Sequence, residues 1–302
     1  GGAMYGVVPR VLWEKLTPPD ELNRVRLSMN LLLIRGPEGV VLVDAGLGTR
    51  LGKRDRRIFG HEPEGGVQAA LERRGVRPGD VDVVVLTHLH VDHAAGAVTE
   101  RGGRLEPTFP SARHIVHEAE WRDALAPNAM SAAAYRRDDF LPLEEAGRLE
   151  RVGDFHEVCR GVTTIRTGGH TTGHLMVLVD AGEDGTVAYP ADLVPTRHHF
   201  RRPYVPAVDL YPVEVIERKI ELLREAARGG WTVVLDHDTD GAVGRVLEPE
   251  PDVFVFEEAG EGVAGGGRTE EGACGRGRVD EADAGTGEAA RGAAGSDERT
   301  GA

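Results

Sequence analysis

The segment Val83–His93 places three histidines and an aspartate directly after a run of apolar residues. The apolar run is rich in valine, which is typical of a short buried strand. His88 and His90 lie two residues apart, so in extended backbone their side chains share one face. Asp92 and His93 follow, where two alanines favour the start of a helix. Imidazole and carboxylate groups in this HxHxDH spacing suit zinc, iron, manganese or cobalt, so the segment predicts a metal site.

Three further candidate ligands lie far along the chain, each just after an apolar run. They are His170 after Val162–Arg166, Asp192 after Val187–Tyr189, and His237 after Trp231–Leu235. The first of them stands in a glycine-flanked turn, where the backbone can approach a metal closely. Four ligands are too few for two metal ions, and ligands that follow several strands meet at one edge of a sheet. The sequence therefore predicts that these residues join the HxHxDH cluster.

Strands and helices alternate along the body of the chain, roughly residues 4–256. The patterns predict strands at Leu31–Ile34, Val40–Val43, Val81–Leu86, His114–His117, Val162–Arg166, Leu175–Val179, Val187–Tyr189 and Trp231–Leu235, and helices at Val67–Arg74 and Val213–Arg228. Two hairpin-rich halves with interspersed helices favour an α/β fold in which packed sheets are covered by helices. We therefore assign residues 1–256 to one domain.

The composition changes sharply at residue 257. Residues 257–302 are mostly glycine, alanine and charged residues, and they include no aromatic side chain. Such a segment cannot bury enough apolar surface to offset the entropy lost on ordering. We predict a disordered, dispensable acidic tail, with an interaction tail as the alternative.

Charge and hydropathy exclude several classes of partner. The net charge of −14 argues against nucleic acid or an anionic membrane as the main partner. The sequence contains no apolar run near the ~20 residues of a membrane span. The only two cysteines, Cys159 and Cys274, do not form a disulfide framework or a CxxC site. A cytoplasmic location is therefore the expectation, and a homodimer is left open.

The order of the candidate ligands resembles that of the metallo-β-lactamase superfamily. The match runs from the HxHxDH segment through His170 and Asp192 to His237, and it covers residues 5–250. Leu42–Gly46 resembles the early strand of that fold that ends in an aspartate, here Asp44. The resemblance implies an αββα sandwich, with two mixed β-sheets covered by helices and the metals at one edge.

The same resemblance implies a role for each ligand. His88, His90 and His170 would bind the first metal ion, Asp92, His93 and His237 the second, and Asp192 both. The two divalent ions, with Zn²⁺ favoured and Fe, Mn or Co as alternatives, would share a hydroxide that attacks an ester carbonyl. Asp92 would pass a proton to the leaving group. Asp44 and His174 are candidates to orient the ligand imidazoles, with polar turn residues as the alternative.

Within the superfamily, the chain best resembles the lactonase-like branch, which includes quorum-quenching N-acyl-homoserine-lactone lactonases. True class B β-lactamases lack the bridging Asp192, and flavodiiron proteins have glutamate in place of His90. The resemblance implies a hydrolase of a small ester, with a lactone favoured. Pro195 stands where the best-studied lactonases have a tyrosine that touches the substrate carbonyl. An organophosphate or phosphodiester hydrolase and a non-catalytic ligand-binding module are the alternatives.

Two loops near the candidate ligands invite further predictions. Thr196–Tyr204 is rich in aromatic and imidazole groups and is predicted to form a wall of the substrate pocket. There, His199 is predicted to donate a hydrogen bond to the substrate in place of the missing tyrosine, with a surface histidine as the alternative. Asp236, Asp238 and Asp240 flank the last candidate histidine. We interpret these three as a solvated turn, with a separate calcium site as the alternative.

Overall fold

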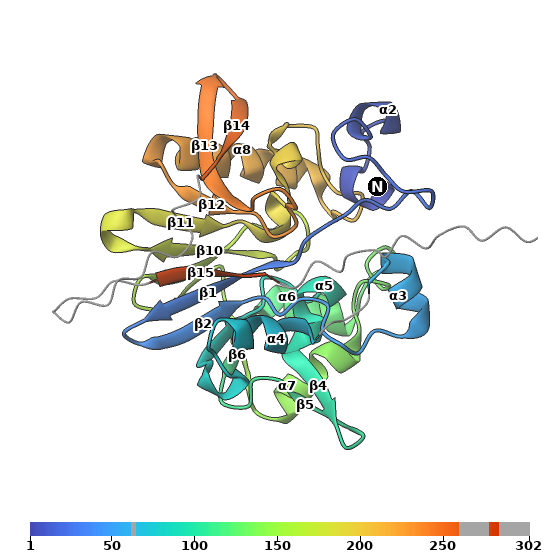
Figure 1. Cartoon of the computed structure of the whole chain (residues 1–302), viewed down its shortest axis with the longest axis vertical. Coiled ribbons are helices and arrows are strands. Elements are labelled where there is room, and N and C mark those ends of the chain that lie inside the picture. The colour runs from blue at the N-terminus through green and yellow to red at the C-terminus, as the bar shows by residue number, and fades with distance from the viewer. Residues whose placement is uncertain (62–64, 260–277, 284–302) are drawn as a thin grey trace, which may run out of the picture.

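Two β-sheets pack face to face, and helices cover their outer faces (Figure 1). The computed structural model describes residues 1–61, 65–259 and 278–283. Both sheets mix parallel and antiparallel pairs. The predicted αββα sandwich is therefore confirmed.

Among the described residues, the first sheet has six strands. Their spatial order is β15 (Arg278–Asp283), β1 (Asn30–Gly36), β2 (Gly39–Val43), β3 (Val83–Val85), β6 (Arg113–His117) and β7 (Leu149–Val152). The first pairs are antiparallel, and β2, β3, β6 and β7 run parallel to one another. The strands predicted at Leu31–Ile34 and Val40–Val43 are thus confirmed as β1 and β2, which form an antiparallel hairpin.

The second sheet has seven strands within the described residues. Their order is β14 (Val253–Glu258), β13 (Val243–Glu250), β12 (Thr232–Val234), β11 (Thr186–Tyr189), β10 (Leu175–Asp180), β9 (Val162–Arg166) and β8 (Phe155–Cys159). Only β11 and β12 pair in parallel in this part of the chain. A separate ribbon joins β4 (Val98–Arg101) to β5 (Arg104–Pro107).

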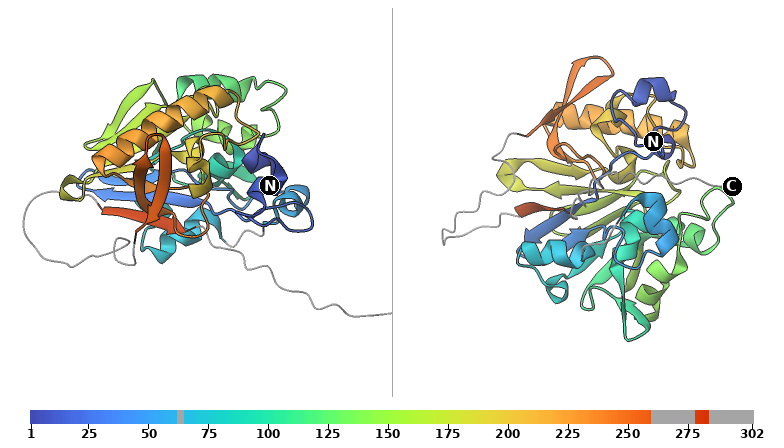
Figure 2. Two further views of the ribbon diagram at one scale, coloured as in Figure 1. Left: turned by 90° about the horizontal axis from the view of Figure 1, so that it is seen from above. Right: turned by 45° about the vertical axis from the view of Figure 1, so that its right-hand side comes forward.

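Helices lie on both outer faces of the sandwich. The α-helices are α1 (Gly2–Tyr5), α2 (Arg10–Trp13), α3 (Lys53–Phe59), α4 (Gly66–Arg73), α5 (Val91–Ala94), α6 (Glu118–Leu125), α7 (Leu141–Glu145) and α8 (Pro212–Gly229). Short 3₁₀ helices are η1 (Pro78–Asp80), η2 (Ala95–Ala97), η3 (Arg137–Asp139), η4 (Gly182–Asp184), η5 (Ala191–Leu193) and η6 (Arg197–Phe200). In Figures 1 and 2, α8 lies over the second sheet, and α4 to α7 lie beside the first. No helix in the described ranges combines the length and apolarity of a membrane span.

Alternating side chains of β1 fill two different cores. Leu31 and Leu33 pack with the helices outside the first sheet, whereas Leu32 and Ile34 pack between the two sheets. Neighbouring residues of a strand point to opposite faces, so a strand covered on both faces is apolar throughout. This double burial explains the continuous apolar run in the sequence.

The outer face of the second sheet is covered by α8. Val215, Leu222 and Ala226 of this helix are buried in one cluster with side chains of β12 and β13. The helix ends at Gly229, and the next residue, Gly230, has a φ of 62°, the left-handed conformation that glycine adopts without strain. Lys219 lies on the same buried side, and its Nζ donates to the carbonyl oxygen of Tyr204 at 2.6 Å.

The buried Lys219 should make stability depend on pH. Burial lowers its pKa from 10.5 to about 7. Between these values the unfolded chain binds more protons, so folding is favoured as pH rises. The unfolding free energy of wild type relative to Lys219→Met should therefore increase by a few kcal/mol, on the order of 3, from pH 7 to pH 10. Urea denaturation of both proteins at the two pH values measures this difference, and a pH-independent difference would contradict it.

The segment predicted as a disordered tail, 257–302, differs from that prediction in two places. Strand β14 continues to Glu258, and β15 pairs antiparallel with β1. An open edge strand pairs through its backbone groups, whatever side chains its partner carries, so composition alone did not predict this strand. The predictions for residues 260–277 and 284–302 lie outside the described residues.

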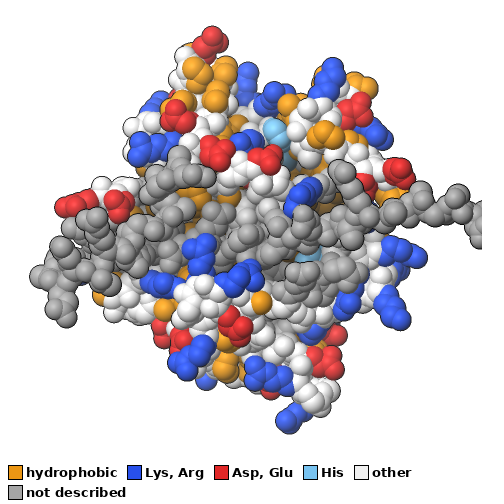
Figure 3. Space-filling view, viewed as in Figure 1, with side chains coloured by type: hydrophobic (Ala, Val, Ile, Leu, Met, Phe, Trp, Pro, Cys, Tyr) orange, Lys and Arg blue, Asp and Glu red, His pale blue; other side chains and the backbone are white. Residues whose placement is uncertain are grey.

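Acidic and basic side chains are interspersed over the face of the molecule shown in Figure 3. On the described part of this face, Lys and Arg do not gather into the broad basic patch that suits nucleic acid. The exclusion of nucleic acid as a partner stays a prediction.

Candidate metal centre

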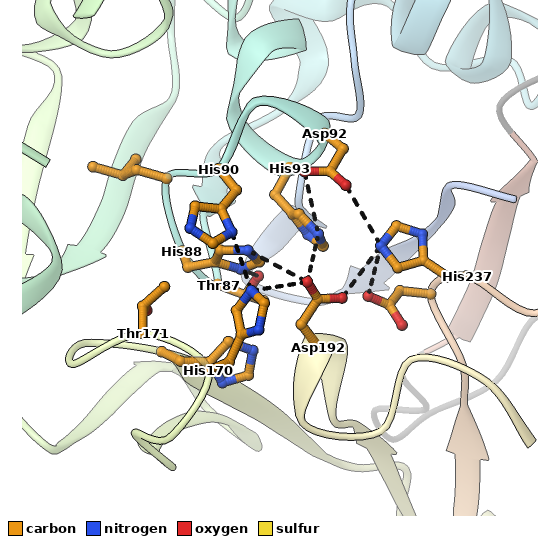
Figure 4. Close-up of polar contacts among 12 residues, drawn as sticks. Thr87, His88, His90, Asp92, His93, His170, Thr171, Asp192 and His237 are labelled. Atoms are coloured by element: carbon orange, nitrogen blue, oxygen red, sulfur yellow. Dashed lines mark hydrogen bonds and ion pairs between the residues drawn. The ribbon is translucent and has the colours of Figure 1, made fainter. Parts of the chain in front are cut away.

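Four strand ends bring the candidate ligands to one edge of the sandwich. Strands β9 and β11 each pair antiparallel with β10 and so share a direction, and β12 is parallel to β11. The loops that follow them carry His170, Asp192 and His237. The loop after β3, in the other sheet, carries His88 and His90, and α5, which follows it, carries Asp92 and His93; both meet the other ligands there (Figure 4).

Asp192 lies at the centre of the cluster. One carboxylate oxygen is 3.0 Å from His170 Nε2, and the other is 3.2 Å from His237 Nε2. The Nε2 atoms of His88 and His93 are each 3.7 Å from Asp192 Oδ2. Figure 4 shows the four rings directed toward this carboxylate.

The buried side chains form two groups that share Asp192. One group is His88, His90, His170 and Asp192, and the other is His93, Asp192, Asp236 and His237. Within each group, the candidate ligand atoms lie within 4.8 Å of one another. Buried Nε2 atoms of His88 and His93 have no hydrogen-bond partner in the described structure. Closely spaced, unpartnered nitrogen and oxygen atoms of this kind fit two divalent cations.

Hydrogen bonds fix the orientation of the rings. Two of the rings donate from Nδ1 to carboxylates: His93 donates to Asp44 Oδ2 at 2.9 Å, and His170 donates to Asp209 Oδ1 at 2.7 Å. The other two donate from Nδ1 to uncharged oxygens: His237 donates to the Ser28 carbonyl at 2.8 Å, and His88 donates to Thr87 Oγ1 at 3.2 Å. In the neutral form of each ring, this bond leaves the Nε2 lone pair available to a cation. His90 is turned the other way, with Nδ1 3.1 Å from His170 Nε2.

Asp44 orients more than one group. Its carboxylate also accepts from the Thr87 backbone N–H at 2.9 Å and from the Thr87 hydroxyl. The φ of Asp44 is 61°, a left-handed conformation that is uncommon outside glycine, asparagine and aspartate. Asp44 therefore has the orienting contact proposed from the sequence. His174 lies beside His88 and His170, but its Nδ1 is bonded to Thr167 Oγ1.

A buried glutamate that was not predicted from the sequence connects two of the ligand-bearing loops through hydrogen bonds. Glu120 of α6 accepts from the Leu89 backbone N–H at 2.9 Å and from the Thr171 hydroxyl at 2.5 Å. It also accepts from the Tyr135 hydroxyl at 2.9 Å. The loop after β3 and the turn that carries His170 are thus tied to one carboxylate.

The turn before His170 requires glycine. Gly168 and Gly169 have φ values of 62° and 80°, in the left-handed region. A Cβ on Gly169 would lie 2.6 Å from a side-chain carbon of Val215 in α8. The glycine-flanked turn noticed in the sequence therefore lets this loop pass close to the helix.

The carboxylates and imidazoles shift one another's pKa values. Burial lowers the pKa of His90 to about 3. Burial also acts against the charged form of His93, but the carboxylates of Asp44 and Asp192 outweigh it and raise its pKa to about 9. Burial opposes ionisation of Asp192, yet the surrounding imidazoles hold its pKa well below the usual range. Asp192 therefore stays an anion at the centre of the cluster.

Replacing Asp209 should loosen the group around His170. An Asp209→Ala variant loses the acceptor for His170 Nδ1, and such outer partners are worth roughly 10–100-fold in metal affinity or activity. Asp209→Asn keeps an acceptor oxygen and should lose less. Metal retention against a chelator, together with kcat/KM, measures both variants. Wild-type values for Asp209→Ala would show that this bond does not position the ring.

Asp92 lies at the rim of the cluster. Its side chain is 37% exposed, and its oxygens are 3.8 Å from His237 Nε2 and 4.0 Å from His93 Nε2. The structure thus places all seven predicted ligands together, with Asp92 the most accessible. Its roles as ligand and proton carrier stay predictions.

The contacts of His199 differ from the predicted contact with the substrate. His199 is fully buried, its Nδ1 bonds to Thr196 Oγ1 at 2.8 Å, and its Nε2 donates to the Met4 carbonyl at 2.8 Å. Its ring stacks on Tyr5, and burial lowers its pKa to about 3. Both nitrogens are occupied by the protein, so the prediction of a hydrogen bond to substrate is wrong.

The turn around His237 is not solvated as interpreted from the sequence. Asp236 and Asp238 are buried, and only Asp240 is exposed. Asp238 accepts from the backbone N–H of Arg197 at 2.8 Å and from its guanidinium at 3.1 Å. Asp236 instead belongs to the second ligand group.

Known proteins share both the sequence pattern and the fold. The metallo-beta-lactamase superfamily matches residues 25–256. N-acyl homoserine lactonase AttM of Azorhizobium caulinodans is 30% identical over 228 residues, which cover 71% of this chain and 83% of that protein. A probable metal-dependent hydrolase from Staphylococcus aureus is 29% identical, with a TM-score of 0.77 over 86% of this chain and 92% of that one.

A more distant structure shares the fold. The dizinc quorum-quenching lactonase AidC is 19% identical, with a TM-score of 0.64 over 77% of this chain and 80% of that one. The family match covers every candidate ligand and the strands of both sheets, except β15 and the end of β14. The chain therefore belongs to the metallo-β-lactamase superfamily, in which it is a hydrolase similar to the lactonase-like branch.

Proposed function

We propose that the chain is a dinuclear metal-dependent hydrolase that opens a lactone, such as an N-acyl-homoserine lactone. The observation that carries this proposal is the sharing of Asp192 by two buried ligand groups. Two divalent ions held there, with Zn²⁺ favoured, would supply a nucleophilic hydroxide at neutral pH and polarise an ester carbonyl. The similarity to the N-acyl homoserine lactonase of Azorhizobium caulinodans supports the choice of substrate class.

The protein's own groups would prepare this chemistry. The Nδ1 bonds of His88, His93, His170 and His237 hold their rings in one tautomer, with Nε2 toward the centre. The pKa of Asp192 is held well below its usual range by the imidazoles around it, so it remains an anion. Asp92 is partly exposed beside His237, where its carboxylate would hold a proton and deliver it to the leaving alkoxide.

A substrate panel tests the proposal. Purified protein, with its metal content counted, is assayed on lactones, aryl esters and phosphotriesters. We expect the highest kcat/KM on a lactone, and His88→Ala should abolish the activity on every substrate if the hydrolysis belongs to this centre. Turnover of phosphotriesters above that of lactones would overturn the lactone assignment and favour an organophosphate hydrolase.

A further inference from the structure

Asp236 is a buried carboxylate whose oxygens have no hydrogen-bond partner among the residues that the structure describes. The residue follows β12, and it is only 1% exposed. Neither Oδ1 nor Oδ2 is hydrogen-bonded within the described structure. A carboxylate removed from water in this way is strongly unfavourable unless a positive charge or a hydrogen-bond donor lies beside it.

Asp238, in the same turn, is also a buried carboxylate, but it has hydrogen-bond donors. Asp238 accepts from the backbone and the guanidinium of Arg197. The basic group beside Asp236 is the imidazole of His237, whose Nε2 lies 3.6 Å from Asp236 Oδ2. Because that nitrogen also faces Asp192 at 3.2 Å, it cannot neutralise both carboxylates.

Hydrogen bonds from Asn30 hold the backbone around Asp236 in place. The Asn30 backbone N–H donates to the Asp236 carbonyl at 2.7 Å. The Asn30 side-chain amide donates to the carbonyls of Leu235 at 2.9 Å and Asp238 at 2.8 Å. Three contacts from the start of β1 thus hold this segment. Within the second ligand group, one carboxylate oxygen of Asp236 lies within 4.8 Å of a ligand atom of each of His93, Asp192 and His237.

We propose that Asp236 is a further ligand of the second metal ion, an inference that rests on the proposed metal centre. The two positions then differ in chemistry. The first is dominated by the imidazoles of His88, His90 and His170, whereas the second combines two imidazoles with the carboxylates of Asp192 and Asp236. Carboxylates favour harder ions, so the second position accepts Mn²⁺ more readily than the first.

Metal retention by the intact holoprotein tests this inference. Wild-type protein is titrated with a competing chelator, and the ions that remain on each chain are counted. Asp236→Asn should release its second ion at a chelator concentration at least about tenfold lower, while its first ion is retained as in wild type. The matched control is Asp240→Asn, the same change at an exposed position of the same turn, which should behave as wild type.

A second measurement separates coordination from hydrogen bonding. If Asp236 were instead a protonated partner of Asp192, the asparagine amide would replace it, and the second ion would be held as before. That outcome overturns the inference. Co²⁺-loaded Asp236→Asn should also show altered visible absorption from the second position, and an unchanged spectrum with full loading contradicts it. Mn²⁺ exchange should replace one ion of the wild type first, and equal exchange at both positions would contradict the difference in preference.

The outcomes also separate this inference from the proposed function. Wild-type protein that holds two ions but hydrolyses no lactone overturns the substrate, and leaves Asp236 as a ligand. An Asp236→Asn variant that holds both ions as tightly as wild type overturns the ligand assignment, and leaves the substrate untouched.

Discussion

Asp192→Ala should lower kcat/KM for ester hydrolysis by at least about a thousandfold, an order-of-magnitude expectation for removing a charged group from a reacting centre. This carboxylate faces four imidazoles and is shared by both ligand groups. The Asp192→Ala change leaves the two metal positions without the carboxylate that they share. The variant should therefore also hold fewer metal ions per chain than wild type.

The control for this variant is Asp184→Asn, which changes an aspartate in the exposed turn η4. Its kcat/KM and metal content should match those of wild type. Steady-state kinetics with metal analysis on the same samples distinguishes a lost ion from a lost catalytic group. Asp192→Ala with two ions per chain and near-normal turnover would contradict a shared carboxylate at the centre.

Removing the metal ions should lower the melting temperature by about 10 °C or more. Without cations, the Nε2 atoms of His88 and His93 and the oxygens of Asp236 remain buried and unpartnered. An ion present at a thousand times its dissociation constant contributes about 4 kcal/mol, and each kcal/mol moves the melting temperature by roughly 2–4 °C. Both estimates point to a shift that is easily measured.

Circular dichroism melts before and after dialysis against a chelator measure this shift. Adding Zn²⁺ back should restore the original melting temperature, and adding Ca²⁺, which prefers more oxygen ligands, should not. Protein shown to be free of metal that melts at the original temperature would refute the expectation.

The candidate metal ligands could be predicted because each lies close in sequence to the end of a buried strand. His88 to His93 follow β3 directly, and Asp192 and His237 follow their own strands within a few positions. Parallel strand directions then bring these loops to one edge. The central strands could be predicted for a related reason, since buried strands are apolar along their whole length.

The residues that support the ligands could not be read from the sequence, because their role depends on packing. Asp209 and Ser28 contact His170 and His237 across 39 and 209 positions of the chain. Asp236 looked like one of three acids in a polar turn, and only its burial separates it from Asp240. His199 failed for the opposite reason, since its place beside the ligand loop in sequence does not fix where its ring points.

The hydrogen bonds that hold the loop around His237 have a consequence for the order in which the chain folds. Ser28 and Asn30 hold the loop at 235–238 through bonds that span more than 200 positions. His90 and His170, by contrast, are separated by 80 positions. Closing the longer loop costs more chain entropy and delays its contacts. During synthesis, the first metal position is therefore expected to form before the second, whose residues 235–238 leave the ribosome later.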